Sequence, residues 1–184
     1  MPKPTYDFKQ SPNYKLGSAS RKITAIVIHY TGSMNMDGTV SWFLNPAAKV
    51  SAHYVVGREG QVLQMVHDQD VAWHAGRSAM RPELPDGDPH KETNVNAFSI
   101  GIELVGTHDS GFTDKQLATL YSLLELLVTR YRVKPERVVG HNHIAPGRKT
   151  DPDGYNHQFN WAKTRQVSQV AYSAVTRPTP PVNG

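Results

Sequence analysis

Apolar residues follow two patterns along this chain, one typical of buried strands and one typical of amphipathic helices. Residues 23–29 (ITAIVIH) are largely β-branched and almost continuously apolar, which indicates a strand in the middle of a sheet. Residues 53–56 and 61–66 flank the turn sequence Gly-Arg-Glu-Gly and predict a β-hairpin. Shorter apolar runs at residues 99–105 and 137–140 predict two further strands.

Helical periodicity is clearest between residues 114 and 131. Seven side chains recur there at helical spacing and share one face: Leu117, Leu120, Tyr121, Leu124, Leu127, Val128 and Tyr131. Thr113 as the N-cap, with Gln116 three residues later, predicts a capping box. A second amphipathic helix is predicted at about residues 160–175, and a short helix is predicted to end before Pro46.

Strands that alternate with helices predict an α/β fold, a single domain with a mixed central β-sheet flanked by helices. We expect residues 1–22 to form an N-terminal surface segment, residues 23–176 the folded domain, and residues 177–184 a flexible tail. Residues 77–96 are rich in Pro, Gly, Asp and Glu and predict a long loop, and residues 141–159 predict another.

The composition narrows the possible classes of protein. At 184 residues the chain is long enough for one domain with one hydrophobic core. No apolar run approaches the roughly 18 residues that span a bilayer, and the N-terminus lacks the apolar stretch of a secretory signal. We therefore expect no membrane span and synthesis in the cytoplasm. The formal net charge of +4 fits either an anionic partner or a solvated basic surface, and it decides nothing alone.

Cysteine is absent, so a zinc site in this chain has to use histidine and carboxylate ligands. His29 and His141 each follow an apolar strand sequence, and Asp151 comes ten residues after His141. Two imidazoles and one carboxylate give zinc three protein ligands and leave a fourth position for water, as in catalytic sites. Spacing alone leaves another interpretation open, because a histidine after a strand is more often a hydrogen-bonded surface residue. His143 is a further candidate ligand.

Glu103 is unusual because it interrupts an apolar strand. In the sequence SIGIELV the aliphatic residues at alternate positions share one face, whereas Gly101 and Glu103 share the other. A carboxylate in that position is paired, functional or on a solvated face. Lys149, close to Asp151, fits a role beside a metal and fits an ordinary surface cation equally.

Five segments follow one another in a recognisable order: IVIHYTG, VSAHYVVGREGQVLQ, AWHAGRS, NVNAFSIGIELVGT and GHNHIAPGRKTDP. In these segments the chain, from about Ile23 to Trp161, closely resembles the zinc-dependent N-acetylmuramoyl-L-alanine amidases of the amidase-2 family. That family includes muropeptide-recycling amidases, envelope amidases, phage endolysins and the peptidoglycan recognition proteins. The resemblance implies the fold of that family and an enzyme that hydrolyses the amide bond between N-acetylmuramic acid and L-alanine.

The resemblance also implies roles for individual residues. His29, His141 and Asp151 match the zinc ligands, Glu103 matches the general base, and Lys149 matches a cation that stabilises the transition state. Further positions match motifs that line the family's substrate groove: His53, Trp73, His74, Asn96 and Arg148. In such a site Glu103 moves a proton from water to the leaving amine, and Lys149 opposes the charge on the tetrahedral oxygen.

Two features of the sequence concern the branch of the family that the chain resembles and the shape of its substrate groove. Ala52 stands before His53, where phage lysozyme-type members and the recognition proteins have tyrosine, and this favours the recycling and envelope branch. After Asp151 the chain runs PDGYNHQFNW, a longer loop than is usual in the family, and it contains His157. We therefore expect the groove wall near the metal to differ.

Two classes of function have to be distinguished. One is hydrolysis of peptidoglycan or of muropeptides by a monomeric enzyme, and the other is a non-catalytic module that binds peptidoglycan. The presence of all three ligand positions and of Glu103 favours the hydrolase. We expect no nucleic-acid partner, because no aromatic and basic signature accompanies the positive charge. Muropeptide recycling and phage-type lysis both fit, and the short segment between His29 and His53 slightly favours lysis.

Overall fold

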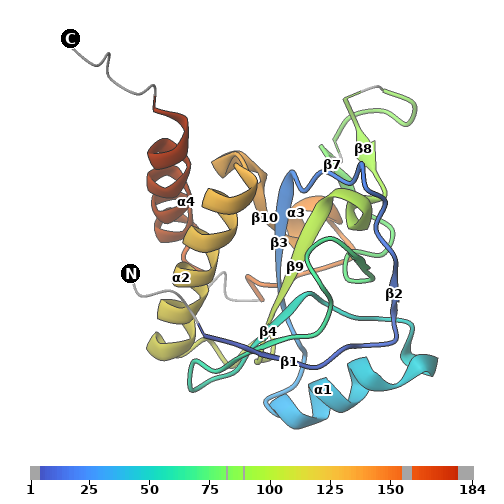
Figure 1. Ribbon diagram of the computed structural model, residues 1–184, viewed down its shortest axis with the longest axis vertical. Coiled ribbons are helices and arrows are strands. Elements are labelled where there is room, and N and C mark those ends of the chain that lie inside the picture. Colours follow the sequence, from blue (N-terminus) through green and yellow to red (C-terminus); the bar gives the residue numbers. More distant parts are fainter. Residues whose placement is uncertain (1–4, 82, 89, 155–158, 178–184) are drawn as a thin grey trace.

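The computed structural model describes residues 5–81, 83–88, 90–154 and 159–177, and within them a six-stranded mixed sheet forms the centre of the fold (Figure 1). Its strands are β1 (Asp7–Phe8), β5 (Val62–Gln64), β4 (Tyr54–Val56), β9 (Ser99–Leu104), β3 (Ala25–Tyr30) and β10 (Val138–Gly140), in that spatial order. The last four of these run parallel, whereas β4 and β5 form the predicted antiparallel hairpin. The predicted α/β fold with a mixed sheet is confirmed.

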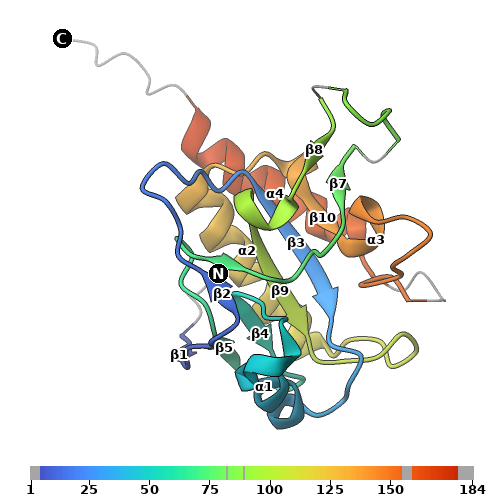
Figure 2. The same cartoon turned by 90° about the vertical axis from the view of Figure 1, so that its right-hand side faces the viewer.

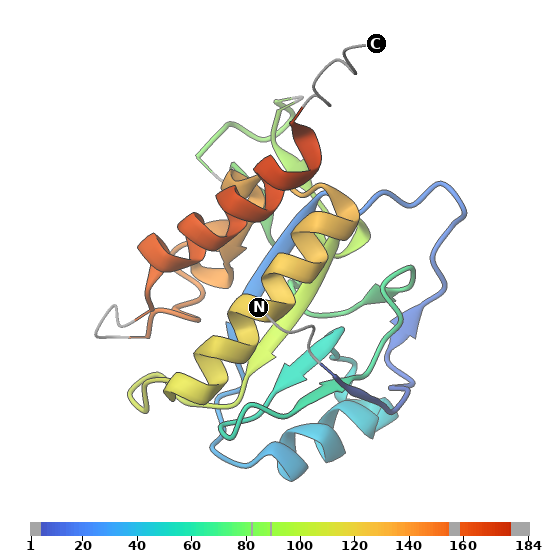
Figure 3. The same ribbon diagram turned by 60° about the vertical axis from the view of Figure 1, so that its left-hand side comes forward.

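Two long helices, α2 (Asp114–Tyr131) and α4 (Trp161–Thr176), lie side by side over one face of this sheet (Figure 3). The opposite face carries α1 (Met36–Leu44), the short helix α3 (His141–Ile144) and several loops (Figure 2). Single 3₁₀ turns in the described residues span Pro46–Ala48, Val95–Phe98 and Pro135–Arg137. Within the described residues, no helix is long and apolar enough to cross a membrane.

The two faces of β9 have different surroundings, as the alternation in its sequence predicts. Ile100, Ile102 and Leu104 are completely buried in the aliphatic cluster formed by the sheet and by α2 and α4. Burial of each such side chain contributes roughly 1.5–3 kcal/mol relative to exposure. Gly101 and Glu103 alternate with them and so face the other side of the sheet, together with His29 on the neighbouring strand.

The start of α2 is held to the sheet by side chains. The Thr113 hydroxyl oxygen accepts a hydrogen bond from the Gln116 backbone N–H, at 3.1 Å, so Thr113 is the predicted N-cap. The reciprocal half of the predicted capping box is wrong, because the Gln116 amide donates instead to the carbonyl oxygens of Val56 and Val105, at 2.9 and 3.0 Å. Gln116 is completely buried, so its amide needs hydrogen-bond acceptors inside the protein, and carbonyl groups at the ends of two strands supply them.

The N-terminal segment is more deeply integrated than its polar sequence suggests. Strand β1 pairs with β5, and β2 (Tyr14–Lys15) pairs with β6 (Val71–Ala72). Ser11 and Asn13 between them are buried, and both donate to the carbonyl oxygen of Phe43 at the end of α1. Most residues of the segment 7–15 are exposed, as expected of a surface segment, but Ser11 and Asn13 are buried and the backbone of the two short strands completes hydrogen bonds that the neighbouring strands leave open.

Two predicted loops contain regular structure. The segment 77–96 includes an antiparallel pair formed by β7 (Ala79–Met80) and β8 (Glu92–Thr93). The segment 141–159 begins with α3. His157 and most of the predicted tail lie outside the described residues.

Candidate metal centre and its cleft

Three adjacent parallel strands, β9, β3 and β10, bring the candidate catalytic side chains to one edge of the sheet. Because the carboxyl ends of parallel strands meet at the same edge, residues at these ends lie close together. His29 is the penultimate residue of β3 and stands beside Glu103 in the strand register. His141 follows the last residue of β10 and opens α3.

Three ligand-type atoms converge at this edge. The Nδ1 atoms of His29 and His141 are 3.0 Å apart, and Asp151 Oδ2 lies 2.9 Å from the first and 3.1 Å from the second. All three residues are buried and form the one cluster in the described residues that could hold a metal ion. Ligand atoms around a tetrahedral zinc ion are about 3.3 Å apart, so a small outward movement of this triangle fits the ion.

The chemistry of these donor atoms also fits a cation. His141 Nε2 lies 3.0 Å from the carbonyl oxygen of Ala75. A carbonyl only accepts, so Nε2 carries the proton of the neutral ring and Nδ1 presents its lone pair to the cluster. Asp151 is buried, and its Oδ2 atom faces both Nδ1 atoms as the third donor of the cluster. Burial lowers the pKa of His29 and favours its neutral, metal-binding form.

Glu103 is not on a solvated face. Its side chain is 8% exposed, and its Oε2 atom has no hydrogen-bond partner among the described residues. Burial, and next the negative charge of Asp151, raise the pKa of Glu103 well above its usual value, while Lys149 opposes this shift. A buried carboxylate oxygen without a partner is costly, and such groups occur where a site needs a proton carrier or a ligand.

A cleft of about 460 Å³ opens over the cluster. Glu103 and Lys149 line it together with the three ligand-type residues, and Lys149 stands on its exposed side. Trp42, from α1, forms another wall and is 55% exposed. Trp42 was not predicted from the sequence, although an aromatic residue next to the buried stripe of a short helix is the signal that could have indicated it.

The five predicted substrate-groove residues are placed differently from one another. His74 and Arg148 line the cleft. His53 is completely buried, where its Nδ1 accepts from the Gly101 N–H and its Nε2 donates to the Asp70 carbonyl. Both ring nitrogens of His53 are therefore occupied by backbone groups.

Asn96 and Trp73 stand apart from the metal cluster. The Asn96 side-chain oxygen accepts from the backbone N–H groups of His74 and Ala75, at 3.2 and 2.8 Å. Trp73 lines a separate cavity of about 420 Å³, together with Asn96 and Lys15. Asn96 thus holds the turn that carries His74, and Trp73 faces away from the cleft.

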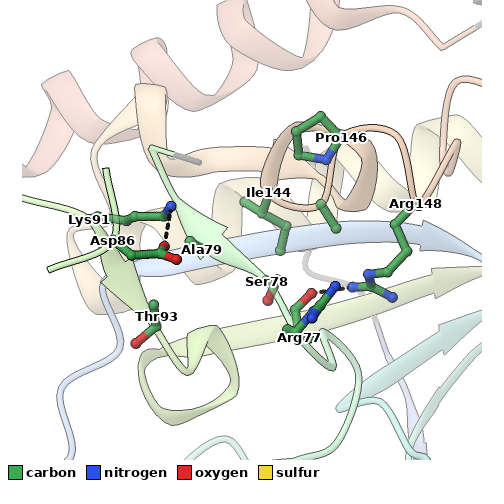
Figure 4. Close-up of a pocket in the computed structure, with 10 residues that line it drawn as sticks. Arg77, Ser78, Ala79, Asp86, Lys91, Thr93, Ile144, Pro146 and Arg148 are labelled. Carbon is green, nitrogen blue, oxygen red and sulfur yellow. Dashed lines mark hydrogen bonds and ion pairs between the residues drawn. The ribbon is translucent and has the colours of Figure 1, made fainter. Parts of the chain in front are cut away.

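Arg148 lines both the cleft and a further cavity of about 440 Å³, which Figure 4 shows. Its guanidinium donates to the carbonyl oxygens of Ala75 and Arg77, at 3.3 and 2.5 Å. On the other side of this cavity, Lys91 pairs with Asp86 at 2.8 Å. Residues of the strand pair within the segment 77–96 thereby form one wall of this neighbouring cavity.

His143, the alternative ligand, turns away from the cluster. Its Nδ1 accepts a hydrogen bond from the Gly140 N–H at 3.0 Å, and its ring packs against Trp161, with the ring centroids 4.5 Å apart. The first turn of α3 therefore directs His141 and His143 to different surroundings.

Known proteins resemble this chain over most of its length. Residues 19–154 match the protein family described as N-acetylmuramoyl-L-alanine amidase. The 1,6-anhydro-N-acetylmuramyl-L-alanine amidase AmpD of Haemophilus influenzae is 32% identical over 172 residues, which cover 84% of this chain and 87% of the relative. The N-acetylmuramoyl-L-alanine amidase AmiD of Escherichia coli K12 is 34% identical over 176 residues, which cover 87% of this chain and 58% of the relative.

Solved structures agree with these relatives. A crystal structure of AmpD has a TM-score of 0.71 and 31% identity, and the match covers 88% of this chain and 93% of that one. Escherichia coli AmiD, in complex with anhydro-N-acetylmuramic acid-L-Ala-D-gamma-Glu-L-Lys, has a TM-score of 0.68 and 32% identity, covering 82% of this chain and 60% of that one. The catalytic domain of XlyA, 20% identical with a TM-score of 0.64, shares the fold.

Proposed function

The chain belongs to the amidase-2 family of N-acetylmuramoyl-L-alanine amidases, and from this premise we propose that zinc held by His29, His141 and Asp151 serves hydrolysis at the cleft. The bond cut joins the lactyl group of N-acetylmuramic acid to the amino group of L-alanine. The observation that carries this proposal is the convergence of two imidazole nitrogens and one carboxylate oxygen beside a buried oxygen of Glu103 that has no hydrogen-bond partner in the described part of the chain.

The donor set favours zinc over other common cations. Two imidazoles and one carboxylate that lie next to one another in space, without thiolates, match catalytic zinc sites, which keep one coordination position open. When bound, zinc supplies Lewis acidity, which acidifies a water molecule and polarises the scissile carbonyl. The protein contributes fixed ligand positions. His29 lies near the end of β3 and His141 directly follows β10, while the Asp151 carbonyl accepts from the Asn142 N–H and so ties its loop to α3.

Glu103 is the proton carrier in this proposal. It stands beside His29 in the strand register and lines the cleft, and its buried Oε2 has no hydrogen-bond partner among the described residues. As a general base it takes the proton of the attacking water, and as a general acid it then delivers that proton to the nitrogen of L-alanine. The carboxyl group holds the proton until the leaving amine accepts it.

Lys149 provides positive charge on the exposed wall of the cleft. Negative charge develops on the carbonyl oxygen as water adds to the amide carbon. A cation fixed near that oxygen stabilises the transition state more than the ground state, which raises kcat.

The substrate class follows from the relatives and from the shape of the site. AmiD has been crystallised with an anhydro-muropeptide that contains this amide bond. In the present chain Arg148 lines both this cleft and a neighbouring cavity beside Arg77, and each offers space for part of such a substrate. We propose that the enzyme acts on peptidoglycan or its muropeptide fragments, as a monomer whose single chain supplies every named group.

Mass spectrometry of the products tests this function. Digested sacculi are expected to yield stem peptides with a free L-alanine amino group and glycan with an unmodified lactyl carboxylate. New reducing sugar ends would indicate a glycosidase and overturn the proposal, and binding to sacculi without any product would indicate the non-catalytic module. Parallel digestion of sacculi and of anhydro-muropeptide distinguishes a lytic from a recycling enzyme.

A further inference from the structure

We propose that the dipeptide His74–Ala75 sets the tautomer and ring orientation of both metal-binding histidines, with His74 acting on His29 through a relay of hydrogen bonds. This inference rests on the proposed metal site, but the hydrogen bonds that carry it belong to the protein alone. His74 is therefore a positioning residue, and neither the family match nor the metal cluster itself assigns it this role.

The relay starts at a carbonyl group, and that group fixes its direction. Ser99 Oγ lies 2.6 Å from the carbonyl oxygen of Val95. Since a carbonyl cannot donate, the hydroxyl proton of Ser99 points to Val95, and Ser99 Oγ is left to accept. His74 Nε2 is 3.1 Å from Ser99 Oγ, so His74 carries its proton on Nε2.

A neutral imidazole has one N–H, so the proton on Nε2 leaves His74 Nδ1 as an acceptor. This atom is 3.1 Å from His29 Nε2. His29 must donate across this contact and therefore carries its own proton on Nε2. Its Nδ1 lone pair is then directed to His141 and Asp151, as metal binding requires.

The second ligand is fixed by the neighbouring residue. His141 Nε2 donates directly to the Ala75 carbonyl, at 3.0 Å. Both Nδ1 atoms are thus deprotonated, and they face each other across 3.0 Å beside a carboxylate oxygen. Three electron-rich atoms at these separations repel one another, and a cation between them removes the repulsion.

The surroundings hold this dipeptide in one position. The Asn96 side-chain oxygen accepts from both of its backbone N–H groups, and Arg148 donates to the Ala75 carbonyl. Gly101 leaves the space that the His74 ring occupies, because a Cβ there would lie 2.4 Å from His74 Cγ. The conformational freedom of glycine is not what matters at Gly101, since its missing side chain is what admits the ring.

Histidine NMR of the metal-free protein tests the relay without reference to activity. With ¹⁵N-labelled histidine, His29 and His74 are expected as Nε2–H tautomers, and His74 Nδ1 is expected to be an unprotonated acceptor. The Ser99→Ala variant, which removes the acceptor for His74, is expected to lose this single-tautomer signature. A proton on His74 Nδ1 in the wild type overturns the relay, even if the protein proves to be an active zinc amidase.

Zinc affinity, measured by competition with a chelator, tests the consequence. His74→Leu is expected to bind zinc about ten- to a hundredfold more weakly, the usual effect of losing a partner that orients a ligand. His74→Asn keeps an acceptor oxygen near the position of Nδ1 and is expected to recover most of this affinity. Gly101→Ala displaces the ring and is expected to weaken binding without altering any hydrogen-bonding group.

The matched control is His53→Leu. His53 is also a buried imidazole whose ring nitrogens bond only to backbone groups of Asp70 and Gly101, and its ring lies edge-on to that of His74, with the centroids 5.8 Å apart. The variant therefore changes the packing beside His74 without removing a member of the relay. It is expected to bind zinc like the wild type even if its thermal stability falls. Equal zinc affinity in His74→Leu and the wild type, or equal losses in His74→Leu and His53→Leu, would show that His74 has no orienting role. Failure of the proposed hydrolysis is a separate result, seen only in the product analysis.

Discussion

The two faces of the central sheet bury different kinds of side chain, although the same strands form both. On the face under α2 and α4, the alternate residues of β9 are aliphatic and pack into one continuous cluster. On the opposite face the intervening residues include Glu103, and the neighbouring strand contributes His29. Burial is equally deep on both faces, with Ile102 at 0% and His29 at 2% exposure.

The two faces differ in how strictly each position requires one particular side chain. Apolar burial has no direction, so the aliphatic face depends on volume and tolerates conservative exchange. On the face that carries His29 and Glu103, here called the metal face, each buried polar group needs a hydrogen-bond partner with the right geometry. Loss of that partner leaves the group unpaired and lowers the free energy of unfolding, and packing does not compensate for this. Mutations on the metal face should therefore act on metal and turnover, and mutations on the aliphatic face should act on stability.

The largest effect is expected from the ligand-type residues. His29→Ala, His141→Ala and Asp151→Ala should each abolish stoichiometric zinc binding, because two remaining ligands do not form a closed site. Metal analysis of the purified variants measures this directly. His143→Ala is the control and should keep its zinc, since that ring turns away from the cluster. Full zinc occupancy in any ligand variant removes that residue from the metal site.

Glu103→Gln should reduce kcat by at least about a hundredfold, because the amide keeps the shape of the side chain but cannot accept a proton. Zinc content and binding to sacculi should be unchanged. Steady-state kinetics with a soluble muropeptide, together with metal analysis, separates these outcomes. A nearly active variant means that the base is elsewhere, and a variant without zinc places Glu103 among the ligands.

Lys149→Ala should lower kcat about a hundredfold and leave zinc in place, because its charge acts on the transition state. The same kinetic assay distinguishes this from a binding role. A change confined to KM instead makes Lys149 a residue that positions the substrate.

Acid should destabilise the metal face through its buried imidazoles. Burial lowers the pKa of His53 to about 4, from an unfolded value near 6.5. Between these values the unfolded chain binds a proton that the folded chain excludes, so the contribution of His53 to stability is complete above pH 6.5 and is lost toward pH 4. This loss amounts to about 3 kcal/mol at most.

Urea denaturation across this pH range, with metal chelated, measures the effect of His53. The slope of unfolding free energy against pH should be smaller in His53→Asn by close to one bound proton. Parallel slopes for the variant and the wild type would show that His53 is protonated alike in both states.

The smallest effect is expected on the aliphatic face. Ile102→Val should cost about 1 kcal/mol of unfolding free energy, the usual result of removing one buried methylene-sized group. Its zinc content and kcat should match the wild type, although Ile102 adjoins Glu103 in the chain. A loss of activity without a loss of stability would contradict the separation of the two faces.

Much of the fold could be predicted because periodicity is a local property. The 3.6-residue repeat of Leu120, Leu124 and Leu127 predicted α2 with its observed bounds, and Thr113 was correctly identified as its cap. The hydrogen-bond acceptors of the Gln116 amide could not be predicted, because they lie 60 and 11 residues away in the sequence, at the ends of strands. The entry of β1 into the sheet was missed for the same reason, since a two-residue strand has no period.

The candidate site also has features that the sequence predicts and features that only folding determines. The sequence by itself determined which residue types follow the buried strands and, through its motifs, which of them group as His29, His141, Asp151 and Glu103. Only the tertiary structure decided that His53 lies wholly within the interior, that Trp73 faces another cavity, and that His74 contacts His29 across 45 residues of chain. Motifs record which side chains are present, whereas a ring nitrogen is made donor or acceptor by partners that folding alone brings within about 3 Å.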